Sequence, residues 1–189
     1  MIYSWKKIVR NGLPLLTVCV LIEIFAGQIL QGKQETLLLF PIFLISIPVI
    51  NGVGGNIGSV LGARLASGLH VGYISIDLKD KEMHENLLIS VLLGVITYLI
   101  LSFIIYCSYY VLSFYGNVPK HLGLLEFVSI VLGAGILLVC VVSIACVFTA
   151  FWSFKKGLDP DDMVAPVVTT VGDVMGIVFL FLWIGLVGL

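Results

Sequence analysis

Charged residues are scarce in this sequence: they make up 11% of its 189 residues, whereas ordinary soluble domains carry about 25%. Hydrophobic residues make up 60%. A soluble domain of this length is excluded, because so few polar side chains could not cover its surface. No basic patch with interleaved aromatic residues is present, so the sequence does not indicate nucleic-acid binding.

Cysteine pairs are also lacking, which excludes two further kinds of site. Cys19, Cys107, Cys140 and Cys146 all lie in apolar runs, and none belongs to a C-x-x-C pair. The spacing therefore supports neither a zinc site nor a redox motif, and we expect buried thiols that pack as small hydrophobic groups. The apolar run behind the basic residues at 1–10 is too long for a signal peptide and lacks a small-residue cleavage site.

The sequence is instead dominated by apolar runs, and a membrane-spanning helix needs about 20 such residues. Five runs are long enough, at residues 13–30, 37–69, 87–114, 122–154 and 163–189. The second is unusually long and is interrupted by Pro41, Pro48 and a glycine cluster. We predict an all-α, multi-pass protein of the cell membrane, with a head at 1–12 and a five-helix transmembrane domain at 13–189.

The basic residues predict how these five spans are oriented. One side would hold the head, the polar loop at 70–86 and the turn after the fourth span, and the other side would hold only Lys33 and Lys120. Basic residues on the first side are Lys6, Lys7, Arg10, Lys79, Lys81, Lys155 and Lys156. Because cytoplasmic loops are enriched in lysine and arginine, we expect a cytoplasmic amino terminus and an external Leu189.

The fifth span contains a carboxylate at membrane depth. Asp173 lies roughly 16 Å along the helix from Asp162, about half of a hydrocarbon core. An aspartate at a helix centre costs roughly 3 kcal/mol on insertion scales and is by default a candidate functional residue. Residues three or four positions apart share one face of a helix, and the face that includes Asp173 consists of polar or small residues. They are Asp162, Pro166, Thr169, Asp173 and Gly176. Such a face points to a partner helix or a water-filled path.

The second span carries a comparable stripe of small residues. Its members are Gly52, Gly55, Asn56, Ser59, Gly62, Ala63 and Ala66. A close helix–helix contact is one interpretation, because small residues let membrane helices approach. Asn56 favours a second one, since a lone amide in such a stripe can bind a hydrated cation. Pro48 and the glycines should loosen the backbone, which is tolerated only inside protein or beside a water-filled cavity.

Two segments resemble the signatures of a known family. Pro48, followed by Gly55-Asn56 and then Arg64, is similar to the second-helix signature of MgtE-type magnesium transporters. The spacing to the arginine is closer to that in their archaeal relatives and in the eukaryotic magnesium solute carriers. A second segment resembles the last-helix signature of the same family. It consists of Asp159-Pro160-Asp161-Asp162, followed by Pro166, Thr169-Thr170 and Gly172-Asp173.

The resemblance covers all five spans in order and implies a function. Family members pass divalent cations, magnesium above all, through a pore at the two-fold axis of a dimer. It implies that Asp173 is the central ion-binding residue and that Asn56 lies beside it. This chain would be a single half that pairs with a second copy or a homologous half. Val60 stands where bacterial members have a glutamine, and their cytoplasmic regulatory domains have no counterpart, so gating by those domains is not expected.

Magnesium chemistry suits such a pore. Mg²⁺ sheds water reluctantly and usually touches one or two carboxylates, and a two-fold axis would bring two Asp173 residues together. The expected ion is Mg²⁺, with Mn²⁺ or Co²⁺ as alternatives, held largely through its waters. The site residues that we predict are Asp173, Asn56, Gly55, Thr169 and Asp159. Asp159, Asp161 and Asp162 would also concentrate cations at the mouth, although for Asp161 and Asp162 we favour helix capping, in which their charges complement the helix dipole.

Several alternatives stay open at this level. Glu23 could line the path or pair with Arg64. The acidic and histidine residues of the 70–86 loop could sense a metal or simply be solvated; they are His70, Asp80, Glu82, His84 and Glu85. The chain could be a non-conducting partner subunit. A metal-dependent lipid phosphoryl transferase is less favoured, because no aspartate accompanies Gly62-Ala63-Arg64. Channel or exchanger, and the direction of flow, are undetermined.

Overall fold

The long apolar runs fold as helices, which satisfy their own backbone hydrogen bonds and so suit a hydrocarbon environment. The computed structural model describes residues 5–113 and 122–189. Within them every regular element is a helix. The elements are α1 (Trp5–Gln31), α2 (Gln34–Leu39), α3 (Ile42–Val71), α4 (Lys81–Ser113), α5 (Leu124–Lys155) and α6 (Pro160–Val187).

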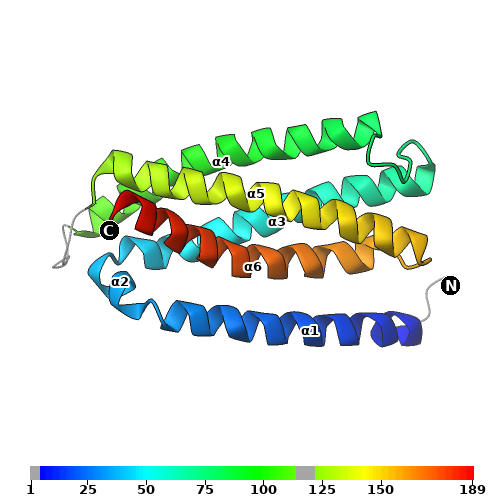
Figure 1. The fold of residues 1–189 in the computed structure, drawn as a ribbon, viewed down its shortest axis with the longest axis horizontal. Coiled ribbons are helices and arrows are strands. Elements are labelled where there is room, and N and C mark those ends of the chain that lie inside the picture. The colour runs from blue at the N-terminus through cyan, green and yellow to red at the C-terminus, as the bar shows by residue number, and fades with distance from the viewer. Residues whose placement is uncertain (1–4, 114–121) are drawn as a thin grey trace.

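Among the described residues, five helices are long and apolar enough to cross a membrane: α1 from Gly12, α3, α4 to Val111, α5 and α6. The predicted all-α architecture with five spans is confirmed, and the protein is a multi-pass membrane protein. The helices run up and down in sequence, so the two chain ends lie at opposite ends of the bundle (Figure 1). The 72–80 loop and the turn between α5 and α6 lie at the amino-terminal end, as the alternation requires.

The interruption of the second span lies at Pro41. Phe40, just after the end of α2, has φ −127° and ψ 78°, outside the helical region that a following proline disfavours. From Ile42 onward α3 continues without a break through Pro48 and the whole glycine cluster. We predicted a loosened backbone at Pro48, and this prediction is wrong, because the helix is continuous there.

Two other boundaries differ from the predicted ones. The polar loop predicted at 70–86 is shorter, because α3 continues to Val71 and α4 begins at Lys81. The basic head overlaps the first turns of α1, which begins at Trp5. The turn predicted at 116–121 lies outside the described residues.

The core is formed where α3, α4, α5 and α6 pack together, and glycines bring these helices close. A Cβ at Gly58 would collide with Val142 of α5 and lie 2.9 Å from Cβ of Val168 in α6. A Cβ at Gly135 would collide with the ring of Tyr98. The Tyr98 hydroxyl donates a 2.8 Å hydrogen bond to the Ile50 carbonyl of α3, so α4 is tied to the glycine-rich stretch.

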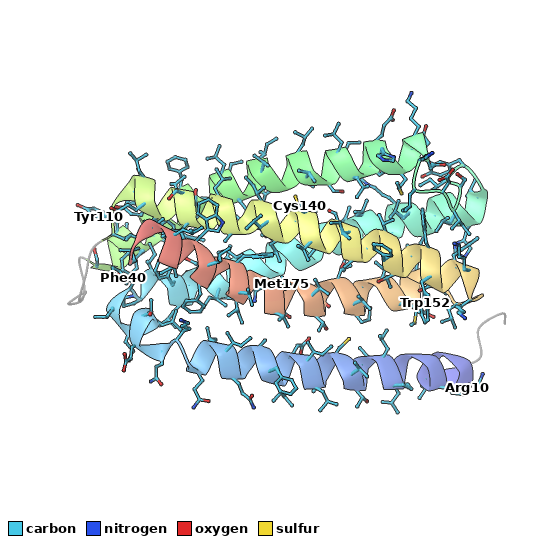
Figure 2. The ribbon with its side chains drawn as sticks, viewed as in Figure 1. Arg10, Phe40, Tyr110, Cys140, Trp152 and Met175 are labelled. Carbon is cyan, nitrogen blue, oxygen red and sulfur yellow. The ribbon has the colours of Figure 1, made fainter. Side chains whose placement is uncertain are left out.

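Helix α1 is peripheral. It packs mainly against α6, and it lies at the edge of the bundle in Figure 1. Among the side chains of α1 that the structure describes, Cys19 and Ala26 are buried, whereas most of the apolar ones are exposed; side chains project from both sides of the helix in Figure 2. This outer surface suits contact with lipid.

We expected the cysteines to be buried. This holds for Cys19 and Cys146, which are buried, but is wrong for Cys107, which is exposed.

Candidate functional site

The crossing of α3 and α6 is built from glycines on both helices. A Cβ at Gly172 would lie 3.3 Å from the backbone nitrogen of Gly55. A Cβ at Gly55 would lie 3.2 Å from Cγ2 and 3.4 Å from Cα of Thr169. A side chain on either glycine would therefore push the two helices apart. These residues let the α3 backbone lie directly against α6, as small residues do between membrane helices.

Asn51 is the polar side chain enclosed in this crossing. Its exposed fraction is 8%, and its Nδ2 donates a 3.1 Å hydrogen bond to the backbone carbonyl of Asp173. Its Oδ1 has no hydrogen-bond partner and lies where a Cβ at Gly176 would collide with it. Gly176 thus provides the space that Asn51 occupies, one turn beyond Gly172 on α6.

Asp173 lies midway along α6 and is partly exposed. Its carboxylate is near enough to Asn51 and to Glu23 of α1 to interact with both. On the same face, Thr169, one turn before Asp173, is exposed, and Pro166, two turns before it, is partly exposed. The stripe predicted on the fifth span therefore borders an open side of the protomer over much of its length. It closes at Gly176, which is buried.

Asn56 lies on an exposed side of α3, as do Gly52 and Ala63. The predicted stripe of small residues is divided by the fold. Gly55 and Gly62 are buried inside the protomer, where a Cβ at Gly62 would collide with Val164 of α6. One edge of the stripe is thus a helix contact, and the other edge is an open surface carrying an amide.

Thr169 uses its hydroxyl hydrogen locally. Oγ1 donates to the carbonyl oxygens of Ala165 and Pro166 at 2.9 and 3.1 Å. The oxygen of this exposed hydroxyl can still accept a hydrogen bond. Thr169 can therefore act toward a hydrated cation only as an acceptor from its water molecules.

Asp159 is the N-cap of α6. Its Oδ1 accepts a 3.1 Å hydrogen bond from the backbone nitrogen of Asp161, and Pro160 follows at the first helical position. Asp161 and Asp162 lie in the first turn, where their charges complement the helix dipole. Asp159 thus makes the capping hydrogen bond, and Asp161 and Asp162 contribute charge in the first turn, where the capping interpretation expects it. All three carboxylates remain at the amino-terminal end of α6.

Glu23 contacts α6 and not Arg64. Oγ1 of the buried Thr170 donates a 3.2 Å hydrogen bond to Oε1 of Glu23. Pairing with Arg64 was one of two interpretations, and it is wrong: in the described part of the chain the recorded salt bridge joins Lys81 and Glu85. Glu23 therefore brings a second carboxylate from α1 to the neighbourhood of Asp173.

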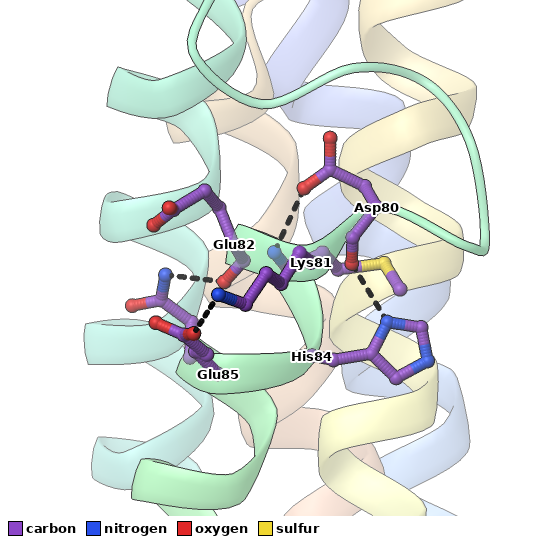
Figure 3. A network of polar contacts seen from close by, with 7 residues as sticks. Asp80, Lys81, Glu82, His84 and Glu85 are labelled. Atoms are coloured by element: carbon purple, nitrogen blue, oxygen red, sulfur yellow. Dashed lines mark hydrogen bonds and ion pairs between the residues drawn. The ribbon is translucent and has the colours of Figure 1, made fainter.

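The loop before α4 has a structural role (Figure 3). Asp80 accepts hydrogen bonds from the hydroxyl and backbone nitrogen of Ser75 and from the backbone nitrogen of Met83. These bonds, the Ser75 hydroxyl first, hold the pKa of Asp80 down at about 2. Nδ1 of His84 contacts the Asp80 carbonyl at 2.7 Å. In residues 5–113 and 122–189 no three His, Cys, Asp or Glu side chains group to hold a metal.

Sequence reasoning missed Asn51 and Thr170. Asn51 was not included in the stripe of small residues, although it is four positions before Gly55 and so lies on the same face of α3. A rule that treats any amide deep in an apolar run as a candidate would have found it. Thr170 was passed over because it neighbours Thr169, which lies on the predicted face. Only the position of α1 identifies its partner.

Known proteins are similar to this chain in sequence. The family model described as MgtE, divalent cation transporter, matches residues 47–183, which include Asn51, Asn56 and Asp173. Solute carrier family 41 member 2 of Mus musculus is 25% identical over 95% of this chain. The corresponding proteins of Macaca fascicularis and Gallus gallus are 25% and 24% identical over the same share.

These matches cover 33% of each relative, so the chain spans about a third of the length of the curated relatives that it matches. The family match, in contrast, covers well over half of the chain and includes most of α3 and most of α6. The chain belongs to the MgtE family of divalent cation transporters.

Proposed function

We propose that this chain transports Mg²⁺ across the membrane, with Asp173 as the central ion-binding residue. The observation that carries the proposal is a partly exposed carboxylate midway along an apolar membrane helix. An aspartate at that depth is costly unless an ion, water or another polar group compensates its charge. Membership of a divalent cation transporter family names the ion class. Asn56 and Thr169 are also exposed, and each has an oxygen that can accept a hydrogen bond from coordinated water.

A second copy of the chain, or a homologous half, completes the site. Asn56, Thr169 and Asp173 leave polar groups on the open side of one protomer, and hydrocarbon would not solvate them. A two-fold axis along this side would oppose two Asp173 carboxylates. Their two negative charges would match one divalent cation. Mg²⁺ keeps most of its water, so Asn56 and Thr169 would act mainly through that water.

Mg²⁺ flux into proteoliposomes tests this function. The purified chain should carry Mg²⁺ down its gradient, whereas empty vesicles should not. Repeating the measurement with and without a sodium gradient separates a channel from an ion-coupled exchanger. Absence of Mg²⁺ flux from well-folded, correctly inserted protein would contradict the proposal.

The assembly prediction follows from the open polar side. We expect the functional unit to be a dimer whose contact involves the exposed edges of α3 and α6. Mass measurement in mild detergent should give twice the chain mass of 20.6 kDa, and cysteines introduced at Ala63 should cross-link between copies. A purely monomeric species with full Mg²⁺ flux would rule out the dimeric pore.

Asn56→Ala should weaken ion capture without closing the path. Its amide would touch the ion mainly through water, and one hydrogen bond is worth about 1 kcal/mol. We expect the Mg²⁺ concentration for half-maximal flux to rise roughly five- to twentyfold, since about 1.4 kcal/mol corresponds to a factor of ten. Maximal flux should change less.

Ser59→Ala is a suitable control for Asn56→Ala, because Ser59 is one turn away on α3 and is only partly exposed. If Asn56→Ala instead unfolds the protein and leaves the affinity of the folded fraction unchanged, Asn56 has a packing role.

A further inference from the structure

We infer that Asn51 is a positioning residue that sets where Asp173 lies in the ion path. The inference rests on the proposed function and adds a residue that acts through Asp173. Asn51 is on α3 and Asp173 is on α6, so their hydrogen bond joins the two helices that carry the candidate site. The bond reaches the backbone of Asp173, and it therefore constrains the position of the residue itself.

The amide is too well enclosed to be an incidental surface group. Asn51 is 8% exposed, and its Oδ1 has no partner among the described residues. A buried acceptor without a partner is destabilising, and an apolar side chain of the same shape would avoid that cost. Packing alone would thus favour leucine at this position. The feature that leucine cannot supply is the hydrogen bond from Nδ2 to the Asp173 carbonyl.

The surrounding glycines make this bond selective for one register of the two helices. The Asn51 side chain fits because Gly176 has no Cβ to meet its Oδ1, and the backbones approach because Gly172 lies against Gly55. Sliding α6 by one residue would place a larger side chain in one or both positions. The hydrogen bond and the two glycines together fix Asp173 relative to α3, and so relative to Asn56.

Asn51 acts through Asp173 and does not reach the open side itself. Its Oδ1 is directed at Gly176, and Leu138 of α5 lies beside the same glycine. Asn56 is exposed on α3, whereas Asn51 is buried between the helices. The two amides of α3 therefore have different functions: Asn56 faces the path, and Asn51 holds the residue that faces it.

Asn51→Leu tests this division, with Tyr98→Phe as the matched control. Each change removes one side-chain hydrogen bond to a backbone carbonyl that joins α3 to another helix. Asn51 of α3 donates to Asp173 of α6, and Tyr98 of α4 donates to Ile50 of α3, the residue next to Asn51. The assay is Mg²⁺ flux in proteoliposomes, recorded as half-maximal concentration and maximal flux, with the melting temperature in Mg²⁺-free detergent. Asn51→Leu should raise the half-maximal concentration roughly tenfold, the effect of about one hydrogen bond to the site, with the melting temperature unchanged or higher.

Tyr98→Phe should lower the melting temperature and leave the half-maximal concentration unchanged. If Asn51→Leu and Tyr98→Phe both alter only the melting temperature, the positioning role is overturned. If Asn51→Leu fails to fold, Gly176→Ala is the variant to test, because its Cβ displaces the Asn51 amide without removing it. An unchanged half-maximal concentration in Gly176→Ala overturns the inference. Asp173→Asn in the same assay separates the two proposals: normal flux in that variant refutes the proposed function, whereas its loss beside a normal Asn51→Leu refutes only the positioning role.

Discussion

Replacing Asp173 by asparagine is expected to reduce Mg²⁺ flux by about a hundredfold or more, equivalent to about 2.8 kcal/mol. Asparagine keeps the shape of the side chain and its backbone carbonyl, so the hydrogen bond from Asn51 should persist. What is lost is the negative charge that compensates the cation, and hydrogen bonds to charged groups are worth about 1.5–3 kcal/mol. Proteoliposome flux, compared at equal protein incorporation, measures the effect.

The same substitution should not destabilise the protein. An ionised carboxylate at membrane depth is costly in the absence of an ion, so the Mg²⁺-free melting temperature should hold or rise. Asp162→Asn is the matched control: it makes the same change on the same helix, but in its exposed first turn. It should alter flux only severalfold. Undiminished flux in Asp173→Asn would place the path elsewhere, with Glu23 as the next carboxylate to test.

Gly55→Leu is expected to abolish transport by separating α3 from α6. The Cβ alone would lie 3.2 Å from Cγ2 of Thr169 and 3.4 Å from its Cα, and a backbone atom cannot rotate away as a side chain can. The remaining three carbons of leucine have no space unless the helices move apart. Overpacking of this kind costs about 1–3 kcal/mol, and the displacement would carry Asp173 away from Asn51 and Asn56.

Flux, melting temperature and dimer content should all be measured for this variant. Gly185→Leu is the control, because Gly185 is on the same helix as Asp173 and has open space at its Cβ position. It should behave like the unmodified chain. A Gly55→Leu protein that conducts normally would show that the close approach of α3 and α6 is not required.

The number of spans could be predicted from the sequence because hydropathy decides it over long stretches. Five apolar runs became five helices, since no other structure satisfies the backbone in hydrocarbon. The location of the break could not be predicted in the same way. Pro41 and Pro48 are chemically equivalent, and only the packing of α3 against its neighbours shows that the chain bends at the first and passes through the second.

The candidate site also contains residues that the sequence could identify and residues that it could not. Asp173 was identifiable because a lone carboxylate in an apolar run is conspicuous, and the resemblance supplied Asn56 beside it. Helical periodicity could not divide the stripe on α3 into a buried edge and an open edge, because periodicity gives angles around one helix and not the position of the next. For that reason Asn51, Thr170 and the partner of Glu23 needed the tertiary arrangement.

The peripheral position of α1 has a consequence for how the protein is made. Within this sequence α1 is synthesised before the other helices, yet it packs mainly against α6, which is synthesised after them. Through most of synthesis Glu23 therefore lies in lipid or against other proteins, without the hydrogen bond that the Thr170 hydroxyl later donates to it. Docking of α1 onto α6 is the closing step of assembly, and it brings the two membrane-embedded carboxylates, Glu23 and Asp173, together only once the rest of the bundle is in place.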